Sequence, residues 1–240
     1  MSSTTPTPPP SSLTERRKAE TRMEIARVAA GLFVRHGLRA TRAEDIAQAA
    51  GIAPRTFYRY FATKEEAVAP LYATGAQRWV EAVRAAPPGA GVLRALEQGV
   101  HHTLTPGVGV SVSSWEWVRT LLRLAEATPS LGRVWAEVCQ ASERRLAEVL
   151  AERVTRAASA GAGGASEVGG ASGAGDNVAV AGESLALTPD LRFAAAVASA
   201  AVRAALEAWA AGDGPVEGPD GPAELALRNL AALRDFPWGR

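Results

Sequence analysis

The sequence predicts an all-α protein, in which a three-helix head of the helix-turn-helix type precedes a larger helical body. Three observations predict this fold class. Apolar residues recur at three- and four-residue steps along much of the chain, and proline and glycine divide it into segments of helix length. One short stretch, 43–60, has the small and apolar residues that two helices crossing at a tight turn require. With 240 residues, 47% of them hydrophobic, the chain can bury a core.

The first helix is predicted over 14–36, where apolar residues form one face between arginines and glutamates. That face comprises Ile25, Val28, Ala29, Leu32 and Phe33. Gly37 is expected to end the helix, which can close the core that two short helices cannot close alone. Residues 1–13 are predicted to be a disordered tail, because proline, serine and threonine there offer little to bury.

The stretch 43–60, AEDIAQAAGIAPRTFYRY, predicts the second and third helices. Ala47 offers only a methyl group where they approach most closely, and Gly51 tolerates the positive φ of the corner. Thr41 and Glu44 predict a capping box ahead of the second helix. The inward positions are assigned to Ile46, Ala47, Ala50, Ile52, Phe57 and Tyr60.

Pro54 predicts the first position of the third helix, because the N–H that proline lacks would be unpaired there. Ala53 then becomes the N-cap. Arg55 lies at the exposed start of this helix, where a guanidinium can pair with guanine O6 and N7 in a major groove. Exposed Arg55, Thr56 and Arg59 are expected beside buried Phe57 and Phe61.

The distribution of charge also separates the predicted three-helix head from the rest of the chain. Between residues 14 and 64, eleven basic residues face five acidic ones, which gives a net charge of +6. The whole chain carries only +1, so the rest carries −5. A basic head on an acidic body is the asymmetry expected when only one domain meets phosphate, although arginine-rich helix faces are also commonly just solvated.

The run 17–71, with its stretch GLRATRAEDIAQAAGIAPRTFYRYFATKEEAV, resembles the N-terminal domain of the TetR family of bacterial transcription regulators. Ala53 departs from the usual capping serine, and Arg42 stands where serine or threonine is usual. The resemblance implies a DNA-binding domain over 14–63, with Arg55 on a base edge and Arg42, Tyr58 and Lys64 mainly on phosphates. The implied DNA-binding residues are Thr41, Arg42, Pro54, Arg55, Thr56, Tyr58, Arg59, Tyr60 and Lys64.

The remainder, 64–240, is predicted to be a helical ligand-binding and dimerisation domain. Its expected helices are 64–86 from a Thr63 N-cap, 90–104, 113–128, 130–159, 190–211 and 221–235. A flexible loop rich in glycine and alanine is predicted over about 160–186. This body resembles those of actinobacterial acyl-CoA-type and mycofactocin-type regulators.

The helix predicted over 190–211 is almost wholly alanine, valine and leucine, which indicates that it is buried. Its expected face is formed by Phe193, Val197, Ala201, Ala204 and Ala205, with Ala200 and Ala208 beside it. The resemblance implies that the last two long helices pair with their copies in a homodimer. The alternative is that they are simply the core of this domain.

All six tryptophans lie beyond the head, and one helix combines Trp115 with Arg119 and Arg123. An apolar pocket with a few polar anchors is what a small-molecule site requires. The expected ligand is a small apolar or acyl-type molecule, whose carboxylate or phosphate the two guanidiniums could hold. Trp79 and His101 are further candidates for the lining, and ordinary packing is the alternative for each residue.

Catalytic and metal-binding patterns are missing from the sequence. Its three histidines and one cysteine form no H-x-x-x-H, C-x-x-C or nucleophile arrangement, and Cys139 alone cannot make an intrachain disulfide. We therefore expect no enzyme, no metal and no cofactor. No apolar run is judged long enough to span a bilayer, and the first residues lack the apolar region of a signal peptide, so a cytoplasmic protein is expected.

Together these features predict a homodimeric, ligand-released repressor of a palindromic double-stranded DNA operator, with half-sites about 34 to 36 Å apart. One alternative is a DNA-binding dimer whose body senses nothing. Another is a helical lipid-binding protein or enzyme with a vestigial head, which the intact recognition face argues against.

Overall fold

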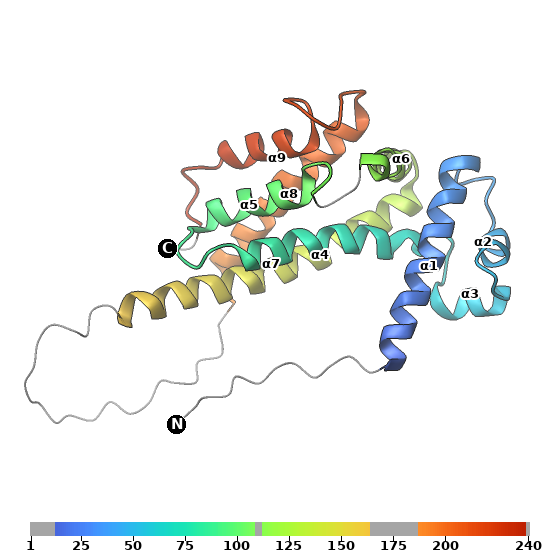
Figure 1. The fold of residues 1–240 in the computed structure, drawn as a ribbon, viewed down its shortest axis with the longest axis horizontal. Helices are drawn as coiled ribbons and strands as arrows, with labels where there is room; N and C mark the ends of the chain where they lie inside the picture. Colours follow the sequence, from blue (N-terminus) through green and yellow to red (C-terminus); the bar gives the residue numbers. More distant parts are fainter. Residues whose placement is uncertain (1–12, 109–111, 164–186, 239–240) are drawn as a thin grey trace, which may run out of the picture. The chain divides into compact units, whose positions relative to one another are not determined.

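The structure, a computed structural model, describes residues 13–108, 112–163 and 187–238 (Figure 1). Within these residues the regular elements are nine α-helices and one 3-10 helix. They are α1 (Leu13–His36), α2 (Ala43–Ala49), α3 (Pro54–Tyr60), η1 (Glu65–Val68), α4 (Ala69–Ala85), α5 (Val92–Leu104), α6 (Val112–Ala127), α7 (Pro129–Gly163), α8 (Pro189–Ala211) and α9 (Pro222–Ala231). The predicted all-α fold class is confirmed.

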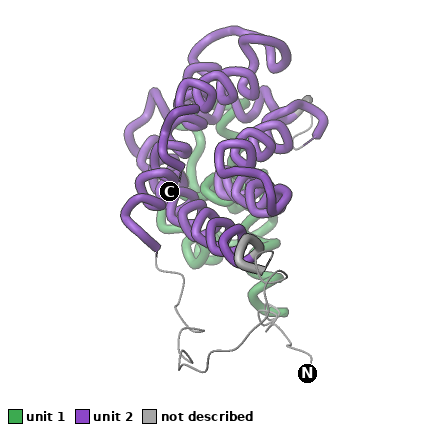
Figure 2. Tube along the Cα trace, turned by 90° about the vertical axis from the view of Figure 1, so that its left-hand side faces the viewer, with its two compact units in different colours: residues 1–71 green, residues 72–240 purple. Residues whose placement is uncertain are grey.

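The chain divides into two compact units, residues 1–71 and 72–240 (Figure 2). The first unit ends eight residues beyond the predicted head, 14–63, because η1 packs against α1. Of the predicted tail 1–13, only Leu13 lies within the described residues, where it begins α1. The chain passes from the first unit to the second within α4.

The core of the first unit joins one face of α1 to the inner sides of α2, α3 and η1. Ala47 and Phe57 are fully buried, as the crossing of two short helices requires. Gly51 has φ +68° and Gly37 has φ +79°, so both predicted glycine turns are confirmed. The buried apolar residues of the first unit are Ile25, Ala26, Ala29, Ala30, Phe33, Leu38, Ala43, Ile46, Ala47, Phe57, Phe61, Ala67 and Val68.

The predicted capping box of Thr41 and Glu44 is wrong by one residue. The N-cap of α2 is Arg42, whose backbone N–H donates to Asp45 Oδ2 at 2.8 Å. Thr41 is instead buried, and its hydroxyl donates to the carbonyl of Gly37 at 2.9 Å. The loop between α1 and α2 turns Thr41 inward, which the local pattern of residue types did not reveal.

The second unit is a helical body in which α8 packs against α6, α7 and α9. The rings of Trp115 and Trp209 pack in its core in a T-shaped arrangement, with centroids 5.4 Å apart. By length and composition α8 could cross a membrane, so the expectation that no apolar run is long enough was wrong. Its buried side, which includes Ala198 and Val202, belongs to the core. The core helix of a protein can have the same length and apolar composition as a membrane-spanning helix.

Helix ends follow the predicted boundaries to within a few residues, with three differences. The predicted helix 64–86 begins as η1, where the Glu66 N–H donates to Thr63 Oγ1 at 3.3 Å, before α4 starts. The last helix ends at Ala231 rather than at residue 235. Of the predicted loop 160–186, residues 160–163 are helical as the end of α7, and 164–186 lie outside the described residues.

Candidate nucleic-acid interface

Helix α3 is short, and its only fully buried side chain is that of Phe57. The predicted start is confirmed: Ala53 is the N-cap, Pro54 occupies the first turn, and the Ala53 carbonyl accepts from Thr56 N at 2.8 Å. Arg55 is exposed and has no ion-pair partner among the described residues. Its guanidinium is therefore available to an outside acceptor.

Tyr58 and Arg59 continue the exposed face of α3. The Tyr58 hydroxyl donates to Glu44 Oε1 at 3.3 Å and thereby links α3 to α2. Partial desolvation and the Glu44 carboxylate raise the pKa of Tyr58, so this hydroxyl stays protonated and can donate. Thr56 and Tyr60 are half-buried.

Lys64 and Thr41, both predicted to contact DNA, hold the loop between α1 and α2. The Lys64 ammonium donates to the carbonyls of Leu38 at 2.6 Å and Thr41 at 2.8 Å. An ammonium has three hydrogens, so one remains for an outside partner. Arg42 is exposed at the start of α2, whereas only 2% of Thr41 is exposed.

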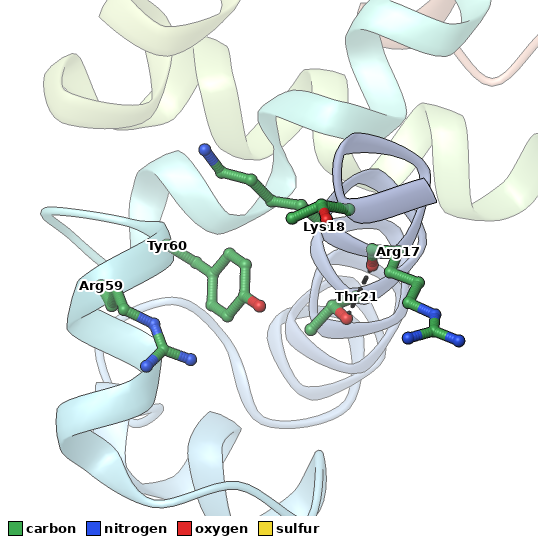
Figure 3. A pocket seen from close by; sticks show the side chains of 6 residues that line it. Arg17, Lys18, Thr21, Arg59 and Tyr60 are labelled. Atoms are coloured by element: carbon green, nitrogen blue, oxygen red, sulfur yellow. Dashed lines mark hydrogen bonds between the residues drawn. The ribbon is translucent and has the colours of Figure 1, made fainter. Parts of the chain in front are cut away.

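A basic pocket of about 410 Å³ lies between α1 and α3. It is lined by Thr14, Arg17, Lys18, Thr21, Arg59 and Tyr60. Figure 3 shows the Tyr60 ring between the two helices, with the side chains of Lys18 and Arg59 on either side of it. Three cations and no carboxylate are among the described residues that line this pocket, so it suits an anion such as a backbone phosphate.

Sequence reasoning missed the α1 side of this pocket. Its four residues, at positions 14, 17, 18 and 21, follow the three- and four-residue steps of one helix face, which was a readable signal. Arg22 fixes the end of α3 beside them. Its Nη1 donates to the Tyr60 carbonyl at 2.6 Å, and its guanidinium lies 4.5 Å from the centroid of the Phe61 ring.

In the second unit the structure brings Trp115, Arg119 and Arg123 together around the end of α8. Trp115 is 1% exposed. The Arg119 guanidinium lies 4.2 Å from the Trp209 ring centroid and donates to the Gly214 carbonyl. These predicted ligand residues therefore make internal contacts, and Trp115 Nε1 is buried without a hydrogen-bond partner in the part of the chain that the structure describes.

Arg123 has the same structural role as Arg119. Its Nε donates to the Ala210 carbonyl at 2.6 Å, and its Nη2 donates to the Gly212 carbonyl at 2.8 Å. Both arginines thus satisfy carbonyls at and after the C-terminus of α8. Elsewhere, Trp79 is buried on α4 against Gly99 of α5, and His101 is exposed on α5.

Among the residues that the structure describes, no group of three or more His, Cys, Asp or Glu is placed to hold a metal ion. Cys139 is half-buried on α7, and burial raises the pKa of its thiol to about 12. The thiol is therefore protonated and neutral at physiological pH.

A compact three-helix unit with an exposed third helix and a basic surface defines a helix-turn-helix DNA-binding protein. Residues 25–69 match the family of bacterial regulatory proteins named the tetR family. The chain is 33% identical over 159 residues to the HTH-type transcriptional regulator TcmR of Streptomyces glaucescens, covering 63% of this chain and 68% of that relative. The chain belongs to the TetR family and is a DNA-binding regulator of transcription, not an enzyme.

Two further relatives match only part of the chain. The HTH-type transcriptional repressor KstR2 of Rhodococcus jostii is 47% identical over 62 residues, which are 26% of this chain and 30% of that protein. A Mycobacterium tuberculosis protein named as a mycofactocin biosynthesis transcriptional regulator, MftR, is 49% identical over 49 residues, 20% of this chain and 25% of that protein. The predicted resemblance to actinobacterial members of the family is confirmed.

Proposed function

We propose that two copies of this chain bind one palindromic operator in the cytoplasm, repress transcription there, and are released by a small-molecule effector held in the body. The observation that carries the proposal is the exposed face of α3. Arg55 and Arg59 on this face have no ion-pair partner among the described residues. The same helix borders the basic pocket. A relative is named as a repressor, which supports the direction of regulation.

The exposed side of α8 supports the dimer. One side of this helix is core, and the opposite side presents a stripe of apolar residues at helical spacing. The stripe consists of Phe193, Val197, Ala200, Ala204 and Ala208. Phe193 is 61% exposed, and the small residues would let a second helix approach closely. Ala205, expected on this face, is buried in the core instead.

Release follows from an equilibrium between two arrangements of the dimer. In one, both recognition helices fit half-sites about 34 to 36 Å apart, and in the other they do not. An effector that binds only the second arrangement lowers the affinity of the dimer for its operator, by no more than the difference in the effector's affinity for the two arrangements. A coupling free energy of about 1 to 3 kcal/mol lowers operator affinity roughly 5- to 150-fold.

An effector of acyl type at Trp115 would have to compete for Arg119 and Arg123, whose hydrogen-bond donors already hold carbonyls at the end of α8. The second candidate function is a dimeric DNA-binding protein without an effector, in which the body only joins the heads. The internal contacts of these two arginines favour it over an acyl sensor at this position.

The test is a selection of operator from random duplexes, followed by affinity measurements on cognate and random DNA. Arg55→Ala should weaken cognate binding by about 1 to 3 kcal/mol and relax preference at one base pair per half-site, because one bidentate contact is lost. Lys18→Ala should weaken binding to cognate and random DNA alike. It should also reduce the slope of log affinity against log salt concentration by about one, as expected for the loss of a phosphate contact.

Arg27→Ala is the matched control, because Arg27 is exposed on α1 but lies nine residues, or about 180° of helix, from Lys18. Arg27→Ala should change neither the affinity for cognate DNA nor the affinity for random DNA. Equal losses on cognate and random DNA for Arg55→Ala would contradict base readout by Arg55, and failure to select any duplex would contradict operator binding.

A further inference from the structure

A second pocket, of about 510 Å³, lies between α6, α7 and α8 in the body. Its volume is within the range of small-molecule sites, about 300–1,000 Å³. The lining residues are Leu122, Ala125, Glu126, Gly132, Trp135, Ala136, Cys139, Gln140, Glu143, Arg203 and Glu207. Apolar side chains, one indole and several charged groups thus meet in one hollow.

The charged groups of this pocket are unbalanced. Three carboxylates face one guanidinium, and that guanidinium, of Arg203, is already paired with Glu207 at 3.4 Å. Glu207 also accepts from Trp135 Nε1 at 2.8 Å. Glu126 and Glu143 make no ion pair among the described residues. The Cys139 thiol is neutral, so the described lining of the pocket has two more negative than positive charges.

Trp135 gives the pocket an aromatic surface as well as its link to Glu207. A cation over an indole face is attracted by the ring quadrupole, and nearby carboxylates add to that attraction. Leu122, Ala125 and Ala136 offer apolar contact to an uncharged part of the same molecule. The chemistry that fits this lining is an organic cation with an apolar body.

Trp135 also connects the pocket to α4. Its ring lies edge-on to that of Tyr72, with centroids 5.1 Å apart, and the Tyr72 hydroxyl donates to the Leu121 carbonyl at 2.9 Å. Tyr72 is buried at the beginning of α4, at the residue where the second unit starts. A ligand that displaces the Trp135 ring must therefore alter the packing of the helix that continues the chain out of the head.

We propose that the effector site is this pocket between α6, α7 and α8, that it takes an organic cation with an apolar body, and that Trp135 and Tyr72 carry its effect to α4. The proposal rests on the proposed function, since it names the ligand class and the route of release. It replaces the acyl-type ligand expected at Trp115.

Ligand class is tested by calorimetry on the purified full chain without DNA. The probes are benzyldimethyloctylammonium, neutral benzyl octyl ether and anionic 4-octylbenzenesulfonate, which are similar in size and differ in charge. We expect the cation to bind about tenfold tighter than the ether, because two carboxylates favour it. Binding of the sulfonate as tight as that of the ammonium, or no binding of the ammonium, overturns the proposal.

Location is tested with isosteric variants. Glu143→Gln and Glu126→Gln should each weaken ammonium binding by about three- to tenfold, since each removes one charge. Glu137→Gln is the control, because Glu137 is exposed on the same helix as Glu143 and does not line the pocket. If all three variants bind the ammonium as the parent does, the site is not this pocket.

The route is tested by following release of selected operator DNA as the ammonium is added. Tyr72→Leu removes the ring contact and should bind the ammonium within about threefold of the parent while losing most of the release. Tyr72→Phe keeps the ring and should release like the parent. Full release by Tyr72→Leu overturns the route. Operator binding by the parent without ligand is measured first, so a failure of the proposed function is distinguished from a failure of the pocket.

Discussion

At the scale of single residues, Lys64 shows how a side chain can have a structural role that its sequence position does not reveal. The family resemblance implies a phosphate contact, and the structure shows that the ammonium also holds two carbonyls of the loop between α1 and α2. These carbonyls lie 26 and 23 residues earlier in the chain. Local patterns report helix faces and caps, and they do not report which distant carbonyl a lysine reaches once the core has formed.

Lys64→Met should therefore destabilise the head. The substitution keeps an apolar stem but leaves the Leu38 and Thr41 carbonyls without their donor, and an unsatisfied buried acceptor costs about 1–3 kcal/mol. Because all six tryptophans lie beyond the head, urea unfolding is followed by circular dichroism and amide exchange rather than by tryptophan emission. Arg27→Met, at an exposed site of α1, should stay within about 0.5 kcal/mol of the parent. Equal stability of the two variants would contradict the structural role of Lys64.

At the scale of helices, Arg153 of α7 holds the C-terminus of α4 and the turn that follows it. Its Nη1 donates to the carbonyls of Val83 at 3.2 Å and Ala86 at 2.8 Å, and its Nη2 donates to those of Pro87 at 3.0 Å and Ala90 at 2.9 Å. These include carbonyls that a helix end leaves unpaired, and the negative end of the helix dipole favours a cation there. Burial lowers the pKa of Arg153, yet a guanidinium remains charged at physiological pH.

Arg153→Met should lower the free energy of unfolding of the body by at least about 1–3 kcal/mol, because several buried carbonyls lose their donor. Arg153→Lys should recover only part of this loss, since an ammonium lacks the planar fork of a guanidinium. Thermal melting followed by tryptophan emission measures both variants. Arg156→Met, at an exposed position one turn later, is the control. A melting temperature for Arg153→Met equal to that of the control would show that the carbonyls are satisfied in another way.

The order and approximate ends of the helices were predictable because proline, glycine and apolar periodicity are local signals. Gly37, Gly51 and Pro54 each mark the turn or helix start that the sequence indicates. The contacts of Arg153 and Arg119 were not predictable. Arginine occurs throughout this chain, and only the packing of distant helices decides which guanidinium is buried on a carbonyl.

At the scale of the whole molecule, α8 has two apolar sides, one buried and one exposed. Ala194, Ala198 and Val202 pack in the core, while the stripe that begins with Phe193 is largely exposed. Within the described residues, the Phe193 ring contacts that of Phe236, with ring centroids 5.5 Å apart. The sequence reading left core and dimer interface as alternatives for this helix. The structure gives one side to the core, which leaves the other side for the proposed second copy.

Ala204→Glu tests that dimer, because Ala204 is exposed within the stripe and a two-fold axis would bring two copies of the new carboxylate close together. Unpaired charges buried in an interface are strongly unfavourable, so we expect sedimentation to show monomers at concentrations where the parent is a dimer. Affinity for the full operator should fall at least about tenfold, since two linked heads bind far tighter than one, while affinity for a single half-site stays unchanged. Ala141→Glu, at an exposed position of α7, is the control and should remain dimeric. A dimeric Ala204→Glu with parental operator affinity would place the contact between copies on another face of the body.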